Sequence, residues 1–233
     1  MNWFKIYKYN SYNLRLPTEI ESQIDIVVNN IINFYKTLKS IPASPVQIGT
    51  ISFFNIYSKS DISVNIFMNN QFVEDDGDTP AKRDRNTGNI YLNIFKQSIS
   101  VPQDFNDESL KYTLRNTLKN QLYHELSHSI DPKIISLNKQ YSGMDEKLRP
   151  TEFDGYSQEI TRYILEAYKI PQNKEKIREW VTSSFFGEDN NEIMGLLKIP
   201  DYIFNIIKKW RYDNPDFLKR FRQRIYNEIM TKG

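Results

Sequence analysis

The sequence has no cysteine among its 233 residues, and this absence excludes several kinds of site. A disulfide framework, a zinc site with thiolate ligands and a cysteine nucleophile all need the missing side chain. Histidine is nearly absent as well, with two residues in the whole chain. A metal site would therefore have to combine these two histidines with aspartate or glutamate.

Long hydrophobic runs are also missing. The opening residues, MNWFKIYKYNSYNLRLP, lack the apolar stretch of about 7 to 15 residues that is typical of a secretory signal. No run approaches the roughly 20 apolar residues of a membrane-spanning helix. We therefore expect a cytoplasmic protein without a membrane partner, or a protein of the virion or host cytoplasm if the source is viral.

A strong excess of one charge is absent too, because 31 basic and 29 acidic residues leave a net charge of +2. This balance gives no global electrostatic argument for a nucleic-acid partner. What the chain does contain is typical of a folded protein, since 39% of its residues are hydrophobic and can supply a sizeable core. The length fits one large domain, or a domain with an appended helical lobe.

Hydrophobic spacing predicts one helix and a sheet in the first half of the chain. Apolar residues recur at helical intervals from Pro17 to about Ser40, with Thr18 as the expected cap. Alternating or strand-like spacing then appears in three segments, which are expected to form one sheet: Val46–Tyr57, Ile62–Met68 and Ile90–Phe95. The charged stretch from 73 to 88 is predicted to be an exposed loop.

After residue 104 the spacing is helical to the end of the chain. Apolar residues at every fourth position from Leu110 to Ile130 predict a helix from about Asn106 to Ser129. A second helix is expected from about Pro150 to Lys169, and two or three more between 173 and 230.

Residues 124 to 128 read His-Glu-Leu-Ser-His and lie on the first of these helices. Because successive helical residues turn by about 100°, His124 and His128 lie about 40° apart, and both imidazoles can reach one ion. Glu125 is rotated by about 100° from His124, which suits it to address a metal-bound water rather than the metal. The leucines face the opposite side of the helix, so we expect the polar strip to face a cleft.

A catalytic zinc site needs three protein ligands and one open position. Without a third histidine or a cysteine, the third ligand must be a carboxylate. Glu152 is the first candidate, because the chain after His128 is long enough for the second helix to return to the first; Glu159 and Glu166 are the alternatives.

Gly155 lies one turn beyond Glu152 on the same helical face. A missing side chain at this position would let the two helices approach closely. The alternative is a glycine tolerated in the helix for ordinary packing.

The segments HELSHSID and RPTEFDGY together resemble the gluzincin branch of the zincin metallopeptidases, in which a second helix supplies a glutamate ligand. The sequence pattern HExxHxxD is also similar to that of anthrax lethal factor-like peptidases. The similarity covers roughly residues 88 to 170. It implies an α+β, zincin-like fold, with a small mixed sheet packed on the HExxH helix and a mostly helical C-terminal half. We expect a single metallopeptidase domain, with residues 1–105 as a helix-and-sheet subdomain and 106–233 as a helical subdomain that carries the zinc.

By this resemblance, Ile90–Phe95 would be the edge strand that pairs with an extended peptide or protein substrate. One departure concerns the carboxylate that orients a ligating histidine. The thermolysin-like pattern has an aspartate four residues after the glutamate ligand, where this chain has Tyr156. Asp131, one turn after His128, could take that role, or it could be an exposed residue at the helix end.

The ligand set predicts a zinc-dependent metalloprotease, in the first instance an endopeptidase. Zinc lowers the pKa of its bound water from about 15.7 toward about 7 and polarises the scissile carbonyl. Glu125 would take the proton of this water and pass it to the leaving amine. Tyr141 and Tyr156 are candidates to stabilise the oxyanion, with simple packing as the alternative for both.

Two other classes of function remain open from the sequence. One is a non-catalytic zincin-fold protein with a structural or binding role, although such a site has no need of Glu125. The other is nucleic-acid contact through basic C-terminal helices. There, basic side chains are interleaved with aromatic ones that could equally be core: Lys208, Lys209, Arg211, Lys219, Arg220, Arg222 and Arg224 with Trp210, Tyr212, Phe217 and Phe221. The physiological substrate and the oligomeric state are not encoded in any recognisable pattern.

Overall fold

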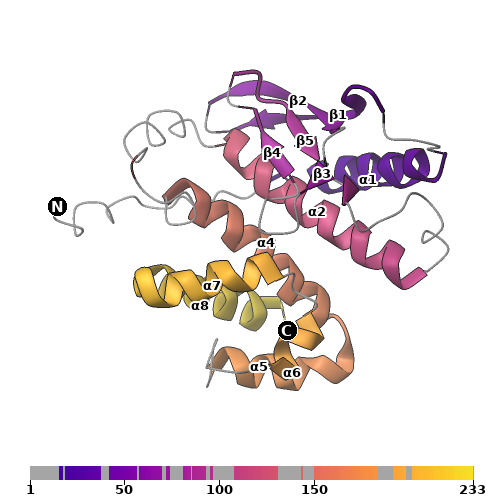
Figure 1. Ribbon diagram of the computed structural model, residues 1–233. Helices are drawn as coiled ribbons and strands as arrows, with labels where there is room; N and C mark the ends of the chain where they lie inside the picture. Colours follow the sequence, from indigo (N-terminus) through magenta and orange to yellow (C-terminus); the bar gives the residue numbers. More distant parts are fainter. Residues whose placement is uncertain are drawn as a thin grey trace.

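The computed structural model describes residues 16–17, 19–37, 42–56, 58–69, 72–73, 81–84, 86–92, 95–96, 108–130, 143, 150–182, 191–197 and 201–232. Within these residues the fold is mixed α+β. A helix and a small sheet come first along the chain, and the rest is helical (Figure 1). The expected fold class is confirmed at this level.

Helix α1 (Glu19–Thr37) precedes a four-stranded mixed sheet. The strand order is β1-β2-β5-β4, in which β1/β2 and β4/β5 are antiparallel and β2/β5 are parallel. The bounds of these strands are Val46–Asn55 for β1, Ser60–Met68 for β2, Ala81–Arg83 for β4 and Ile90–Leu92 for β5. A separate parallel pair consists of β3 (Phe72–Val73) and β6 (Phe95–Lys96).

One strand prediction and one loop prediction in this region were wrong in detail. The segment Ile90–Phe95 contributes to two different sheets, and its first part, β5, lies between β2 and β4 rather than at the edge. The stretch predicted to be an exposed loop contains β4, whose Ala81 is buried. A three-residue strand is too short for an alternating pattern, so its backbone pairing with β5 decides its structure.

Helix α1 covers the free edge of β1. The amide of Gln23 donates to the Ser52 carbonyl oxygen at 2.8 Å and accepts from the Ser52 N–H at 2.9 Å, as a neighbouring strand would. Gly49 allows this close packing, because a Cβ there would lie 2.9 Å from Cγ2 of Val27. One edge of the sheet is thereby closed, and β4 forms the other.

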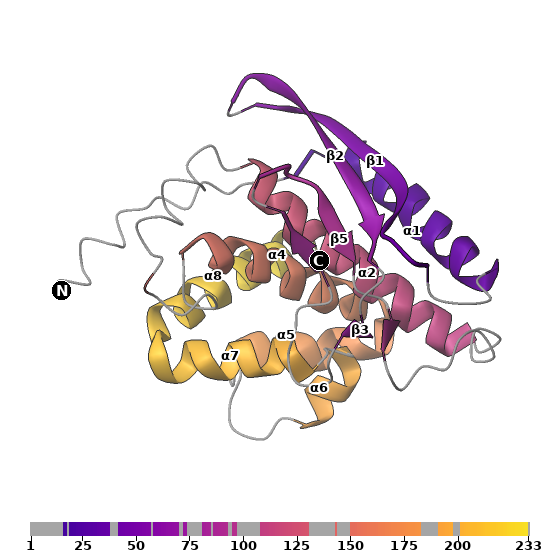
Figure 2. The same cartoon turned by 45° about the horizontal axis from the view of Figure 1, so that its top comes forward.

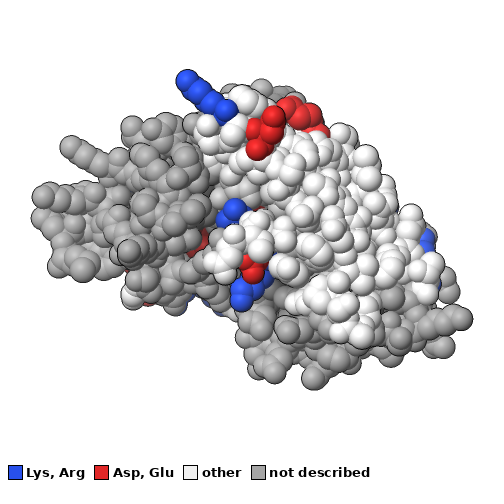
Figure 3. All heavy atoms as spheres, turned by 90° about the horizontal axis from the view of Figure 1, so that it is seen from above, with Lys and Arg blue, Asp and Glu red and all other residues white. Residues whose placement is uncertain are grey.

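The outer face of the β1/β2 hairpin is polar but carries few charges. Thr50 donates to the side-chain oxygen of Asn65 at 2.9 Å, and the hydroxyls of Ser52 and Ser63 are 2.9 Å apart. Seen from above, the described surface consists mostly of residues other than Lys, Arg, Asp and Glu (Figure 3). Cross-strand hydrogen bonds between uncharged side chains therefore stabilise this face.

Helix α2 (Glu108–Ile130) lies beneath the sheet and carries the His-Glu-Leu-Ser-His motif. The predicted leucine ladder is confirmed at Leu118, Leu122, Leu126 and Ile130, which are at most 2% exposed. They join α1 and the sheet in an N-terminal core, defined by the buried apolar residues from Ile20 to Ile130. The side chains of the ladder's first two members lie outside the described residues.

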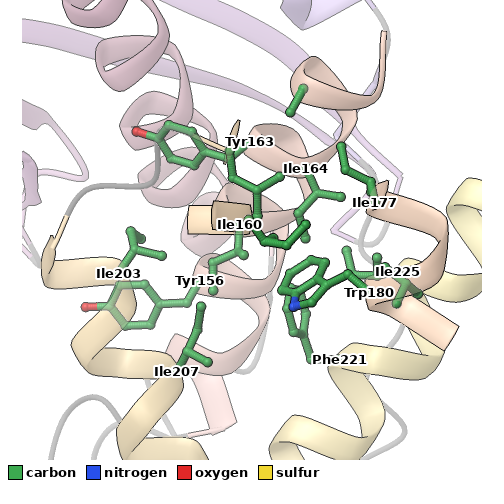
Figure 4. Close-up of a cluster of buried hydrophobic side chains, with 14 of the residues drawn as sticks. Tyr156, Ile160, Tyr163, Ile164, Ile177, Trp180, Ile203, Ile207, Phe221 and Ile225 are labelled. Atoms are coloured by element: carbon green, nitrogen blue, oxygen red, sulfur yellow. The ribbon is translucent and has the colours of Figure 1, made fainter. Parts of the chain in front are cut away.

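Helix α4 (Pro150–Tyr168) opens the C-terminal half and packs on α2. It is followed by a 3₁₀ turn at Pro171–Asn173 and then by helices α5 (Lys174–Thr182), α6 (Asn191–Leu197), α7 (Asp201–Asp213) and α8 (Pro215–Lys232). Their buried apolar residues from Phe153 to Ile229 form a C-terminal core, part of which is drawn in Figure 4.

The aromatic residues of α7 and α8 mostly belong to this C-terminal core. Trp210, Phe217 and Phe221 are at most 2% exposed, whereas Tyr212 is largely exposed. The interpretation of these aromatics as core is therefore confirmed for three of the four. The basic residues among them stay on the outside, with Arg222 donating to the carbonyl of Val181 at 3.2 Å.

The two cores meet where α2 packs on α4. The N-terminal core ends at Ile130 on α2 and the C-terminal core begins at Phe153 on α4. Helix α2 therefore belongs to the same core as the sheet. The expected subdomain boundary at 105/106 stays a prediction, as does the single-domain organisation. Within the residues described above, no helix has the length and apolar character needed to cross a membrane.

Candidate metal centre

The two helices that carry the candidate ligands, α2 and α4, pack against each other and cross (Figures 1 and 2). On α2, the polar strip that includes Gln121, His124, Glu125 and His128 is between 3% and 8% exposed. The side chains of this strip are therefore buried, and the expected cleft beside them stays a prediction. The strip is buried because α4 places its own polar face, with Glu152 and Glu159, against it.

Three side chains from the two helices converge on one point. Oε2 of Glu152 lies 3.4 Å from Nε2 of His124 and 3.3 Å from Nε2 of His128. The three potential ligand atoms all lie within 4.8 Å of one another, so this group could hold a metal ion. Among the three carboxylates considered from the sequence, Glu152 is the one that faces both histidines.

The separations fit a tetrahedral ion. Zinc–ligand bonds of about 2.0 to 2.1 Å at tetrahedral angles separate two ligand atoms by roughly 3.3 Å. The two measured nitrogen-to-oxygen distances are 3.3 and 3.4 Å. These two of the three separations match such an ion, and the third, between the two histidine nitrogens, is within 4.8 Å.

Glu159 lies on the other side of the His124 ring. Its Oε2 is 3.3 Å from Nδ1 of His124, at ion-pair distance, and the residue is 1% exposed. The imidazole is therefore held between two carboxylates, one at each nitrogen. Glu159 is thus a candidate for the orienting carboxylate, whereas Asp131, the candidate from the sequence, lies outside the described residues.

The sequence contained a pattern that could have placed Glu159 beside Glu152. It follows Glu152 by two helical turns, and this spacing puts both carboxylates on one face of α4. The remaining alternative, Glu166, lies at the surface and pairs with Lys169 at 2.6 Å.

Gly155 makes the close approach of α4 to the site possible. A Cβ at this position would lie 2.9 Å from Nε2, 3.0 Å from Cε1 and 3.1 Å from Cδ2 of His124. Since Cβ atoms almost never approach other atoms so closely, any other residue would displace the imidazole or the helix. Of the two interpretations of this glycine, close helix approach is confirmed.

Tyr156 packs directly on His124. The ring centroids are 4.4 Å apart and the planes are 69° from each other, in an edge-to-face arrangement. Tyr156 is also a member of the C-terminal core, and Figure 4 shows it among the isoleucines of that core. Its packing role is thus observed, and the oxyanion role stays a prediction. Tyr141, the other candidate, lies outside the described residues.

Burial and mutual charge shift the pKa values of these groups in the metal-free chain. Burial alone lowers the pKa of His124, but Glu152 and Glu159 outweigh it and raise that pKa to about 10. Burial raises the pKa of Glu152, but His128 and His124 together bring it well below its usual value. Without a metal, an imidazolium and a carboxylate therefore satisfy each other where an ion would bind.

Glu125 is buried beside the group without belonging to it. Burial raises the pKa of its carboxyl, and the neighbouring histidines oppose this rise. A raised pKa is the direction of shift that suits a carboxyl group to act as a general base and acid.

Comparison of the chain with protein-family models, with curated proteins and with solved structures gives no match. The resemblance to gluzincins therefore stays a prediction from the motif residues.

Proposed function

We propose that the protein is a zinc-dependent metallopeptidase of the gluzincin type. In this proposal His124, His128 and Glu152 bind the metal, and Glu125 is the general base. The single observation that supports it most is the convergence of the Glu152 carboxylate on both histidine nitrogens at 3.3 and 3.4 Å, with Glu125 beside them.

The donor set favours zinc among the common metals. Magnesium and calcium prefer sites made of oxygen ligands, whereas two imidazoles and one carboxylate match a catalytic zinc site. Ferrous iron in oxygenases uses the same three donors. A buried carboxylate at position 125, next to the ligand His124, favours hydrolysis, because an oxygenase site has no need of a base there.

The zinc ion, when bound, would lower the pKa of a water molecule and polarise the substrate carbonyl. Side chains of the protein carry out the proton transfers and orient the ligands. Glu125 takes the proton of the attacking water and delivers it to the leaving nitrogen, while Glu159 holds the imidazole of His124 at Nδ1. The packing of Tyr156 on the same ring fixes its plane.

A peptide substrate fits β4 better than the segment expected from the sequence. β4 ends the strand order of the four-stranded sheet and packs on the motif helix α2. An extended peptide added to this edge would run past the metal group. At the competing edge, β1, helix α1 packs on the strand and Gln23 already pairs with the backbone of Ser52.

The test combines metal analysis with a variant that separates metal binding from catalysis. Protein purified without chelator should contain close to one zinc per chain, and a complex peptide library should be cleaved. Glu125→Gln should keep the zinc and the fold but lower the rate by about 10²- to 10⁴-fold, because the amide cannot accept the proton. Glu152→Gln should instead lower zinc affinity.

Each outcome has a distinct meaning. Stoichiometric zinc without any cleavage that depends on Glu125 would favour the non-catalytic alternative. Stoichiometric iron would point to oxygenase-like chemistry. Absence of any metal after reconstitution at neutral pH would refute the proposal.

A further inference from the structure

Arg83, on the edge strand β4, lies on the face of the strand that is toward α2, the helix with the His-Glu-Leu-Ser-His motif. Neighbouring residues of a strand face opposite sides, so Ala81 and Arg83 share one face and Lys82 has the other. Ala81 is buried in the N-terminal core against which α2 packs, and Lys82 is exposed. Arg83 is therefore on the face of the sheet that looks toward α2, and β4 contacts this helix.

The guanidinium group of Arg83 lies against the turn after β4. The Asp84 N–H donates to the Asn89 carbonyl at 2.8 Å, and the Gly88 N–H donates to the Asp84 carbonyl at 2.9 Å. Gly88 has a φ of 74°, and a Cβ there would lie 3.2 Å from Nη2 of Arg83. The absence of a side chain at Gly88 thus leaves the space in which the guanidinium lies.

Asp84, the carboxylate nearest to Arg83 in sequence, has other hydrogen-bond partners. Its Oδ1 accepts from the backbone N–H groups of Asn86 and Thr87, both at 2.8 Å. The Nε atom of Arg83 is buried without a hydrogen-bond partner. The guanidinium therefore keeps donor capacity that this turn does not use.

The charge of Arg83 interacts with the candidate base. Burial lowers the pKa of Arg83, and the carboxylate that opposes this effect most strongly is Glu125, ahead of Asp84. This electrostatic interaction agrees with the geometry, in which β4 packs on the helix that carries Glu125 and Arg83 is on the strand face toward it.

Strand pairing determines which part of a peptide Arg83 would meet. Residues directly opposite each other on paired strands have their side chains on the same face of the sheet. A substrate residue opposite Arg83 would therefore project toward α2, beside the guanidinium. The planar fork of an arginine matches a carboxylate with two parallel hydrogen bonds.

We propose that Arg83 is a specificity residue that binds the carboxylate of an aspartate or glutamate side chain in a peptide paired with β4, close to the scissile bond. This inference rests on the proposed function, and it names the substrate class as acidic peptides. An inward-pointing charge also discourages edge-to-edge association of sheets. That role alone would give no preference among substrates, so the two roles can be separated.

The test uses matched peptides that differ by glutamate or glutamine at the preferred position found in a library screen. The wild-type protein should cleave the glutamate peptide with a kcat/KM about 10- to 100-fold higher, mostly through KM, as expected for charge-assisted hydrogen bonds. Arg83→Gln should abolish this preference, Arg83→Lys should retain part of it, and Arg83→Glu should favour lysine or arginine at the same position. Lys82→Gln, on the opposite face of β4, is the control and should keep the wild-type preference.

Binding provides a readout that does not need cleavage. A peptide array probed with zinc-loaded Glu125→Gln protein should enrich acidic peptides, and the double variant with Arg83→Gln should not. Circular dichroism and zinc content establish that each variant is folded and loaded. If wild-type cleavage shows no acidic preference, or Arg83→Gln keeps it, the proposal is wrong although the peptidase assignment stands. If nothing is cleaved and the array shows no acidic enrichment, both proposals fail.

Discussion

At the scale of single residues, Gly155 determines how close α4 can come to the metal group. We expect Gly155→Ala to destabilise the protein by about 1 to 3 kcal/mol, as overpacking of a close contact does. The added Cβ would press on the His124 ring at 2.9 Å, so zinc affinity should fall as well. Thermal unfolding of the metal-free protein and a zinc titration measure the two effects.

A second helical glycine offers a matched control. Gly195 is exposed on α6, and a Cβ there would meet nothing within 4 Å. Gly195→Ala should therefore stabilise the protein by about 0.5 to 1 kcal/mol through helix propensity alone. Equal effects of the two substitutions would contradict a special role for Gly155.

Glu159 is the residue whose position most changes the description of the site. We expect Glu159→Gln to weaken zinc binding by about 10- to 100-fold, the usual effect of removing the partner of a ligating histidine. Glu152→Gln should weaken it considerably more, because it removes a charged donor from the metal group itself. Competition with a chromogenic chelator would measure both affinities.

The surface carboxylate of Glu166 provides the comparison for these variants. Glu166→Gln removes a charge of the same kind from the same helix, but its partner is Lys169 rather than a histidine. Zinc affinity should not change. If Glu159→Gln abolished zinc binding while Glu152→Gln retained it, the two glutamates would have to exchange roles.

At the scale of elements, the position of α2 depends on a side chain from β1. Nδ2 of Asn55 donates to the carbonyls of Ile130 at 3.1 Å and Ser129 at 3.4 Å, at the C-terminal end of the helix. Asn55 is buried, so Asn55→Ala would leave these carbonyls without that donor. We expect a loss of about 1 to 3 kcal/mol in the free energy of unfolding. Asn65→Ala, on the outer face of the sheet, should cost about 0.5 kcal/mol or less, as surface substitutions usually do.

Helix α4 is tied to the N-terminal core by one arginine. The guanidinium of Arg162 lies 3.5 Å from the ring centroid of Tyr123 on α2, and Nη2 is 3.4 Å from Glu21 on α1. Stacking on an aromatic face and an ion pair fix an arginine in both position and orientation. These contacts join α4 to α2 and α1, in addition to the packing of α4 on α2 that brings Glu152 to the histidines.

At the scale of the whole molecule, the pKa shifts predict how stability depends on pH in the metal-free protein. The pKa of His124 is raised to about 10, so its contribution is fully present below its ordinary value of 6.5 and is lost as pH rises toward 10. The pKa of Glu152 is lowered, so its contribution is present above its ordinary value of 4.5 and is lost in acid. The melting temperature should therefore be highest between about pH 5 and 6.5.

Bound zinc should counteract the loss of stability that the metal-free protein shows as pH rises above about 6.5. The ion needs deprotonated imidazoles, so the rise in melting temperature on adding zinc should grow from pH 5 to pH 8. Calorimetry with and without chelator across this range gives both curves. A metal-free protein that gains stability from pH 7 to pH 9, or a zinc effect independent of pH, would contradict the charge arrangement described for His124 and Glu152.

The sequence by itself determined the features that depend on local spacing. The helical period placed His124 and His128 on one face of a helix, predicted its end at Ser129 against an observed end at Ile130, and put the leucines on the other face. Alternation identified β1 and β2, and the absence of cysteine reduced the candidate ligands to His, Asp and Glu. These results need only the geometry of a helix or a strand.

The tertiary structure decided everything that depends on which surfaces meet. The sequence named Glu152 as the first candidate among three glutamates of one helix. Only the crossing of α4 over α2 shows that Glu152 faces Nε2 of His124, Glu159 faces Nδ1 and Glu166 lies at the surface. Ala81–Arg83 is the edge strand because its backbone pairs with β5. The sequence could not predict this strand, since three side chains are too few to show an alternating pattern. The burial of the polar strip likewise results from packing between segments far apart in the chain, which no local pattern can express.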